Sequence, residues 1–136
     1  MRIGNRVVIG LFNLFRGGKL IQLDDYAMIL RFNFINAILD PHFKTEPQSF
    51  FHLGYGSVIT AEHRIDFTEK VSIGRQTILG GRNSSIWTHN RRSGEGVQIG
   101  DNCYVGSEIR MAPGSAIPSF SIVGLGSVVT SRHDQE

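Results

Sequence analysis

The sequence predicts an all-β protein, a left-handed parallel β-helix of about six coils that forms one domain over residues 1–136. Three observations predict it: aliphatic residues recur every six positions, larger gaps follow every third hexapeptide, and small or polar residues recur four positions after the aliphatic. An α-helix repeats its apolar residues every 3.6 positions and an amphipathic strand every two. Neither accounts for a period of six, so the chain is predicted to be a repeat structure.

The repeat is most regular from residue 99 onward, where six successive hexapeptides begin with Ile99, Val105, Met111, Ile117, Val123 and Val129. The same frame continues upstream in four triplets: Ile3, Ile9, Phe15; Leu23, Ile29, Ile35; Leu53, Ile59, Ile65; and Ile73, Leu79, Ser85. The larger gaps all fall between triplets. That spacing predicts a three-sided coil with one hexapeptide on each face, in which every insertion leaves at a single corner. We expect a loop excursion over residues 36–52 and a second loop over residues 86–97.

The positions four residues after each aliphatic predict what lies near the corners. On the first face they are small: Val7, Ala27, Ser57, Thr77, Cys103 and Ser121. On the second face they predict a buried polar ladder: Asn13, Asn33, His63, Asn83, Ile109 and Ser127. On the third face they are not expected in the core: Lys19, Leu39, Glu69, His89, Ser115 and His133. The third corner is therefore the expected functional one.

The composition is that of an ordinary soluble protein. Of 136 residues, 19% are charged and the formal net charge is +2, which gives little reason to expect a nucleic-acid partner. No run approaches the roughly 20 apolar residues of a membrane-spanning helix, so no integral membrane segment is expected. The single Cys103 cannot form an internal disulfide, which fits a reducing compartment, and we expect a cytoplasmic protein.

Several segments resemble the hexapeptide-repeat (left-handed β-helix) acyltransferases, in particular the sugar O-acetyltransferases of polysaccharide and lipopolysaccharide biosynthesis. They are Trp87-Thr88-His89-Asn90, the run from Ile99 through Gly100-Asp101-Asn102 to Ser107, Ala112-Pro113-Gly114, and the run from Gly124 to Thr130. The resemblance implies acetyl-CoA as co-substrate, a saccharide acceptor, and a homotrimer with sites between subunits. It also implies that a histidine in the loop before the Gly-Asp-Asn segment is the base, and His89 holds that place.

The resemblance further implies cofactor contacts at Ser107, Leu125 and Thr130. The family's usual lysine after Thr130 is replaced here by Ser131, and Arg132 follows it as the cationic candidate. Trp87, Asn90 and Arg91 flank the histidine and are the candidate acceptor-binding residues. Two carboxylates are candidates to orient the imidazole: Glu69, which has the equivalent position one coil earlier, and Glu62, which stands where the family often has an asparagine.

The chemistry of a histidine suits the proposed step. Transfer of an acyl group to a hydroxyl needs a base near neutrality, and histidine has an ordinary pKa near 6.5. N-acetylation of an amino sugar or a serine-type acceptor is the alternative within the same class. Outside that class, the repeat is compatible with a γ-carbonic-anhydrase-like metal protein and with a non-catalytic structural prism. No second histidine lies near enough in sequence to His89 for a shared metal, since the position five later is Gly94, and no metal is expected.

Overall fold

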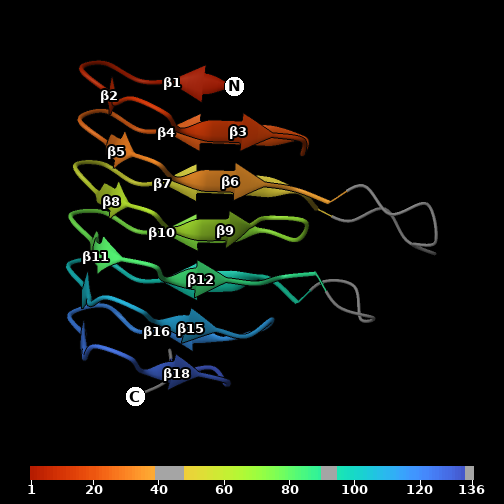
Figure 1. Ribbon diagram of the computed structural model, residues 1–136, viewed down its shortest axis with the longest axis vertical. Coiled ribbons are helices and arrows are strands. Elements are labelled where there is room, and N and C mark those ends of the chain that lie inside the picture. The colour runs from red at the N-terminus through yellow and green to blue at the C-terminus, as the bar shows by residue number, and fades with distance from the viewer. Residues whose placement is uncertain (39–47, 90–94, 134–136) are drawn as a thin grey trace.

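The computed structural model describes residues 1–38, 48–89 and 95–133. Within them, eighteen short strands form three parallel sheets of six strands each. Successive strands belong to successive sheets, so the chain winds around a three-sided prism and each coil stacks on the one before (Figure 1). The predicted all-β fold, a left-handed parallel β-helix of six coils, is confirmed. The described residues form no helix that is long and apolar enough to cross a membrane.

The three sheets are named here as faces A, B and C. Face A contains β1 (Arg2–Ile3), β4 (Leu20–Leu23), β7 (Phe50–Leu53), β10 (Val71–Ile73), β13 (Val97–Ile99) and β16 (Ala116–Ile117). Face B contains β2 (Val8–Ile9), β5 (Met28–Arg31), β8 (Val58–Ala61), β11 (Ile78–Arg82), β14 (Tyr104–Val105) and β17 (Ile122–Val123). Face C contains β3 (Leu14–Arg16), β6 (Phe34–Asn36), β9 (Arg64–Asp66), β12 (Ser85–Ile86), β15 (Arg110–Met111) and β18 (Val128–Val129).

The corners follow the same order in every coil. The first corner joins face A to face B, the second joins B to C, and the third joins C to face A of the next coil. The excursion expected over residues 36–52 spans 37–49, because β6 ends at Asn36 and β7 begins at Phe50. The loop expected over 86–97 spans 87–96 for the same reason. Both lie at the third corner, as the spacing predicts.

The core is built from the aliphatic positions of the repeat. Leu53 pairs in register with Leu23 on one side and Ile73 on the other, and all three are at most 1% exposed. Each such side chain removed from water contributes roughly 1.5–3 kcal/mol. Because side chains alternate between the two faces of a strand, a slip of one residue would turn a strand's aliphatic outward. The register is therefore fixed by the buried column.

The fourth coil departs from the predicted frame. Ile86, and not Ser85, pairs with Ile65 and Met111 and is buried. One extra residue enters at the second corner, where β11 carries an irregularity after Leu79. Burial of the Ile86 side chain stabilises the fold more than burial of Ser85 would, so the period of six is broken here. Gly81, with a φ of 56°, provides the left-handed turn that accommodates the extra residue. The expectation that every insertion leaves at the third corner is wrong for this residue.

The polar ladder at the second corner is confirmed over most of its length. Asn13 Oδ1 accepts from the backbone N–H of Asn33 at 3.0 Å, and Asn33 Oδ1 accepts from that of His63 at 3.0 Å. His63 Nδ1 accepts from Ser84 N–H at 3.1 Å, and Ser84 Oγ accepts from Ile109 N–H at 3.1 Å. Each rung thus satisfies a backbone donor of the next coil, which would otherwise be buried without a partner.

Asn83 is not a rung of this ladder. It is exposed and has a φ of 61°, so it occupies the turn, and Ser84 takes its place in the interior. The one-residue shift of the fourth coil accounts for both positions. A short polar side chain still fills the rung, because the extra residue moves the whole segment together with Ile86.

We expect Ser84→Ala to lower the free energy of unfolding by about 1–3 kcal/mol, because it leaves the buried Ile109 N–H without its acceptor. The neighbouring Asn83→Gly is the control and should change stability by less than about 0.5 kcal/mol, since glycine tolerates the positive φ. Urea unfolding measures both. Equal losses in the two variants would contradict the register described here.

Candidate functional site

The third corner collects the inserted segments of the chain. Residues 39–47 and 90–94, which lie outside the described chain, both fall between a strand of face C and the next strand of face A. His89 directly precedes the second of these segments and follows β12. The predicted base is therefore attached to the predicted corner, at its fourth coil.

Asp66 is the main anchor of this corner. Its Oδ2 accepts from the backbone N–H of His89 at 2.9 Å, and its Oδ1 accepts from the N–H and the hydroxyl of Thr68 at 2.9 and 2.6 Å. One carboxylate thus joins the third coil to the segment that carries the imidazole. Hydrogen bonds of this kind, in which the acceptor is ionised, are roughly twice as strong as neutral ones. The position of the His89 backbone is fixed by a charged group.

Thr88 adds a second attachment beside His89. It is fully buried, its hydroxyl donates to the Asp66 carbonyl at 2.9 Å, and the same oxygen accepts from the Glu69 N–H at 2.9 Å. The chain is therefore held on both sides of the Thr88–His89 peptide bond. Figure 1 shows β12 directly after β9 in the stack of face C, which is the arrangement these contacts require.

Glu69 lies at this corner, but the residue is only 4% exposed, whereas the third-face positions are not expected in the core. Its carboxylate accepts from the Gln48 N–H at 2.9 Å, at the end of the preceding excursion. Ser115, another third-face position, is also fully buried. That expectation is therefore wrong for both residues: the Glu69 carboxylate is bonded to the end of the preceding excursion, and the Ser115 hydroxyl donates to the Ala112 carbonyl at 2.7 Å.

The side chains around His89 differ in exposure. His89 is partly buried, while Trp87 is 46% exposed, and the Trp87 backbone N–H donates to the Met111 carbonyl at 3.1 Å. The two other predicted acceptor-binding residues, Asn90 and Arg91, lie outside the described residues. Of the three predicted acceptor-binding residues, Trp87 is the one within the described chain, two positions before His89.

A polar cleft of about 280 Å³ lies where face A begins after the third corner. It is lined by Lys70, Ser72, Gly96, Val97, Gln98 and Arg132. Arg132 reaches it because the chain after Val129 turns onto face A and forms a bridge with Ala116. Sequence reasoning identified Arg132 but missed Lys70, whose position just before β10 was the available signal. The cleft combines two cationic side chains with polar groups, a combination suited to anions.

The other predicted cofactor residues lie on a different edge. Ser107 and Leu125 are at the second corner, where Ser107 Oγ accepts from the Arg82 N–H at 2.9 Å and Leu125 is 73% exposed. Thr130 follows β18 and is exposed near the third corner. The predicted cofactor contacts of one chain are thus divided between two edges of its prism.

Glu62 also lies at the second corner. It is exposed, has a φ of 59°, and lines a polar groove of about 310 Å³ on face C together with Arg64, Glu108 and Arg110. Within one chain, the structure brings Glu69 and Asp66 to the corner of His89 and places Glu62 at another. Asp66 was missed by sequence reasoning; the signal was an aspartate two residues before Thr68, a spacing typical of a local side-chain turn.

Comparisons with known proteins give a likeness of fold. No protein-family model matches the chain, and no curated protein matches it in sequence. A solved structure of the polySia-specific acetyltransferase NeuO is similar, with 14% sequence identity, a TM-score of 0.48, and coverage of 96% of this chain and 77% of that one. The fold described above rests on the strand order and register of this chain and not on that likeness.

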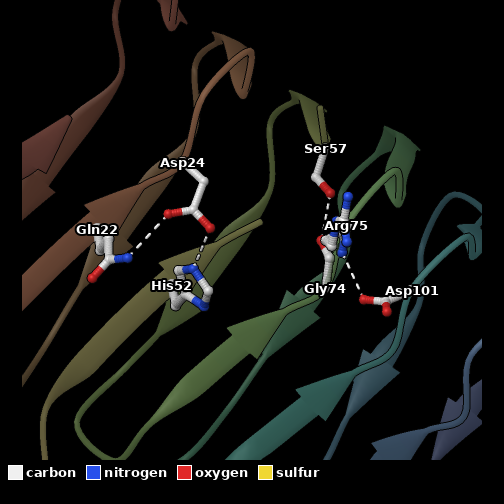
Figure 2. A network of polar contacts seen from close by, with 7 residues as sticks. All are labelled: Gln22, Asp24, His52, Ser57, Gly74, Arg75 and Asp101. Atoms are coloured by element: carbon white, nitrogen blue, oxygen red, sulfur yellow. Dashed lines mark hydrogen bonds and ion pairs between the residues drawn. The ribbon is translucent and has the colours of Figure 1, made fainter. Parts of the chain in front are cut away.

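A second polar cluster lies on the outside of face A (Figure 2). His52 Nε2 lies 2.7 Å from Asp24 Oδ2, and Gln22 Nε2 donates to Asp24 Oδ1 at 3.0 Å. Burial raises the pKa of Asp24, but the hydrogen bonds from Gln22 and His52 and the attraction to the imidazole hold it below its ordinary value. Figure 2 also shows Arg75, whose backbone N–H donates to Asp101 at the first corner.

The described residues contain no group of three or more His, Cys, Asp or Glu side chains that is arranged to hold a metal ion.

His63 is confirmed as a core residue. It is fully buried, and Ser84 donates to its Nδ1, so the ring proton is on Nε2, which lies 3.1 Å from Thr60 Oγ1. Burial lowers the pKa of His63 to about 4, against the opposing effect of the Leu79 and Gly80 carbonyls. The imidazole is therefore neutral in the folded protein across the neutral range.

This shift predicts a pH dependence of stability. The contribution of a neutral His63 is fully present above pH 6.5 and is lost as the pH falls toward about 4, because only the unfolded chain takes up the proton in that window. The loss amounts to roughly 3 kcal/mol. His63→Asn places at this rung the residue found in two earlier coils. This variant should lose less unfolding free energy than the wild type between pH 6.5 and pH 4. A variant whose unfolding free energy falls with acid as steeply as the wild type would contradict the assignment.

Proposed function

We propose that this protein is an acyl-CoA-dependent O-acetyltransferase that moves an acetyl group from acetyl-CoA to a hydroxyl of a saccharide, with His89 as general base. The observation that carries the proposal is the attachment of His89 at the corner of the insertions. Its backbone is held by the Asp66 carboxylate and it stands beside the exposed Trp87. The sequence resemblance around His89 and Ser107 supplies the reaction class.

Acetyl transfer to a hydroxyl requires mainly that the protein position a general base next to the acceptor. The acceptor hydroxyl attacks the thioester carbonyl while His89 takes its proton, and the imidazolium then returns a proton to the departing coenzyme A thiolate. No covalent bond to the enzyme forms. A base acts only within hydrogen-bond reach of the proton, so Asp66 is a positioning residue: it sets where the His89 backbone lies. Of the two acidic residues expected from sequence, Glu69 shares the corner of His89 within one chain, and its N–H is bonded to the neighbouring Thr88.

The cleft on face A fits the anionic part of coenzyme A. Lys70 and Arg132 line it at the same corner from which the 87–96 loop departs. Phosphate groups favour sites with several cationic donors, and arginine presents them in a fixed planar arrangement. We assign Lys70, Arg132 and the adjacent Thr130 to the phosphates of the co-substrate.

The division of residues between two edges favours a site made by two chains. Ser107 and Leu125 belong to the second corner, whereas His89, Lys70 and Arg132 belong to the third. One site uses both sets when one chain supplies the base and the phosphate contacts and its neighbour supplies Ser107 and Leu125. Glu62, on the second corner, then reaches the base of a neighbouring chain. This arrangement requires an oligomer, and we propose the homotrimer that the resemblance implies.

The outside of face B supplies an apolar surface for such an assembly. Its outward positions pair in register from the first coil to the last and are all apolar: Val8, Met28, Val58, Ile78, Tyr104 and Ile122. The corresponding positions of face A are mostly polar: Arg2, Gln22, His52, Ser72, Gln98 and Ala116. A continuous apolar stripe on one face is typical of an interface between chains.

The proposed base is tested with His89→Ala in an assay of acetyl transfer from acetyl-CoA to a panel of saccharides. We expect the rate to fall by roughly 10²- to 10⁴-fold, because general-base catalysis contributes about that much. His52→Gln, which alters a half-exposed histidine on face A, is the matched control and should retain activity. An unchanged rate in His89→Ala, with an acceptor that the wild type uses, removes the proposed base. Transfer to amino groups alone would favour N-acetylation over O-acetylation.

The proposed interface is tested with Ile78→Glu. Ile78 is 37% exposed on face B, so the variant folds as a single chain but places a charge in the stripe. Sedimentation equilibrium should show a trimer for the wild type and a monomer for the variant at micromolar concentration. Gln98→Glu introduces the same negative charge on face A, and this variant should remain trimeric. A wild-type monomer, or a variant that stays trimeric, contradicts this use of face B.

A further inference from the structure

The first coil of the prism differs in its surface from the others. Its inward positions Ile3 and Ile9 are 53% and 40% exposed, whereas Leu23 and Ile29, with which they pair in the next coil, are 1% and 0% exposed. The strands β1, β2 and β3 are the terminal strands of their sheets (Figure 1). The core therefore opens at this end of the described chain.

Further apolar side chains surround the opening. Leu11 and Phe12 are each 73% exposed at the second corner, and Leu14 is 46% exposed on β3. Phe12 stacks on Phe32 of the second coil, with ring centroids 5.2 Å apart, so the two rings form one exposed aromatic surface. We call Ile3, Ile9, Leu11, Phe12 and Leu14 the basal patch. Contiguous apolar surface of this kind marks a binding site.

The charge of the first coil has a single sign. Residues 1–23 contain Arg2, Arg6, Arg16 and Lys19 and no acidic residue. The nearest acidic groups are at the first corner of the second coil, where Asp25 Oδ1 accepts from the Asn5 N–H and where Asp24 and Asp25 share a groove with Arg2. Arg16 lies over the Phe34 ring at 5.5 Å and donates to Asn36, on the opposite side of the prism. The basal patch is thus bordered by cations on more than one side.

We propose that the basal patch binds the surface of an anionic lipid membrane. Apolar side chains beside arginine and lysine are the two elements of interfacial binding: the first enter the boundary between headgroups and acyl chains, and the second are attracted to anionic headgroups. A second copy docked end to end would bring Arg2, Arg6 and Arg16 of both chains together, so like charges oppose it. Charge complementarity therefore favours the lipid surface over a copy of the chain.

The depth of binding is limited by the backbone. Unpaired peptide groups at a sheet edge are costly in hydrocarbon, so β1–β3 stay at the level of the headgroups. Leu11 and Phe12 project from a corner and enter further. With coils stacked roughly 4.8 Å apart, His89 in the fourth coil then lies about 14 Å above the first coil. The third corner faces acceptors presented close to a membrane surface.

The test is co-sedimentation of the 136-residue protein with vesicles. One set contains phosphatidylcholine with a quarter phosphatidylglycerol, and the other contains phosphatidylcholine alone. We expect binding to the anionic set at least tenfold stronger, and weaker as salt rises. Arg6→Gln with Arg16→Gln should weaken it by roughly 25-fold, about fivefold for each cation removed. The assay uses no acetyl transfer, so its outcome is independent of the proposed function.

A matched pair of variants locates the contact. Leu11→Ser with Phe12→Asn should weaken binding on the order of tenfold, and asparagine tolerates the φ of 60° at Phe12. Phe120→Asn is the control: Phe120 is 80% exposed with a φ of 62° at the other end of the prism, and binding should be unchanged. Equal binding to both vesicle sets, or an equal effect of the two variants, overturns the proposal. So does an end-to-end dimer that the Leu11 and Phe12 substitutions dissociate.

Discussion

The stacking of like positions from coil to coil is the constraint on which this structure depends. Leu53 between Leu23 and Ile73 is one example: each aliphatic is buried because the coil above and the coil below place the same kind of side chain in register. A parallel sheet on each face then satisfies the backbone. Once the faces are fixed in this way, the corners are where the chain can vary in length, and the inserted segments and His89 lie there.

Much of this architecture was predictable from the chain. The period of six identified the coil, the gaps after each triplet located the third corner, and the small or polar residues near Asn33 and His63 identified the ladder. The shift at Ile86 was not predictable by counting, because Ser85 and Ile86 are adjacent and the choice between them depends on burial against Ile65 and Met111. The sequence period predicts which residues point inward, but the burial of neighbouring side chains determines where that register shifts by one residue.

The residues of the candidate site were also only partly predictable from the sequence. His89 was identified by its place in the chain, but Asp66 binds its backbone from 23 positions earlier, and no local pattern joins the two. Glu62 was expected near the base by motif, yet the fold places it on another edge. The proposed pairing of edges from two chains would unite these residues. The same prism exposes an apolar, cationic first coil, so oligomer contacts and a surface contact use different parts of the molecule.

The central claim is that the third corner of one chain and the second corner of a neighbour form one acyl-transfer site. The most direct measurement is a crystal structure of the protein grown with coenzyme A. The account predicts the thiol end within hydrogen-bond reach of His89, the phosphates near Lys70 and Arg132, and Ser107 of a second chain against the pantetheine arm. Coenzyme A bound with its thiol remote from His89, or held entirely by one chain, would contradict it.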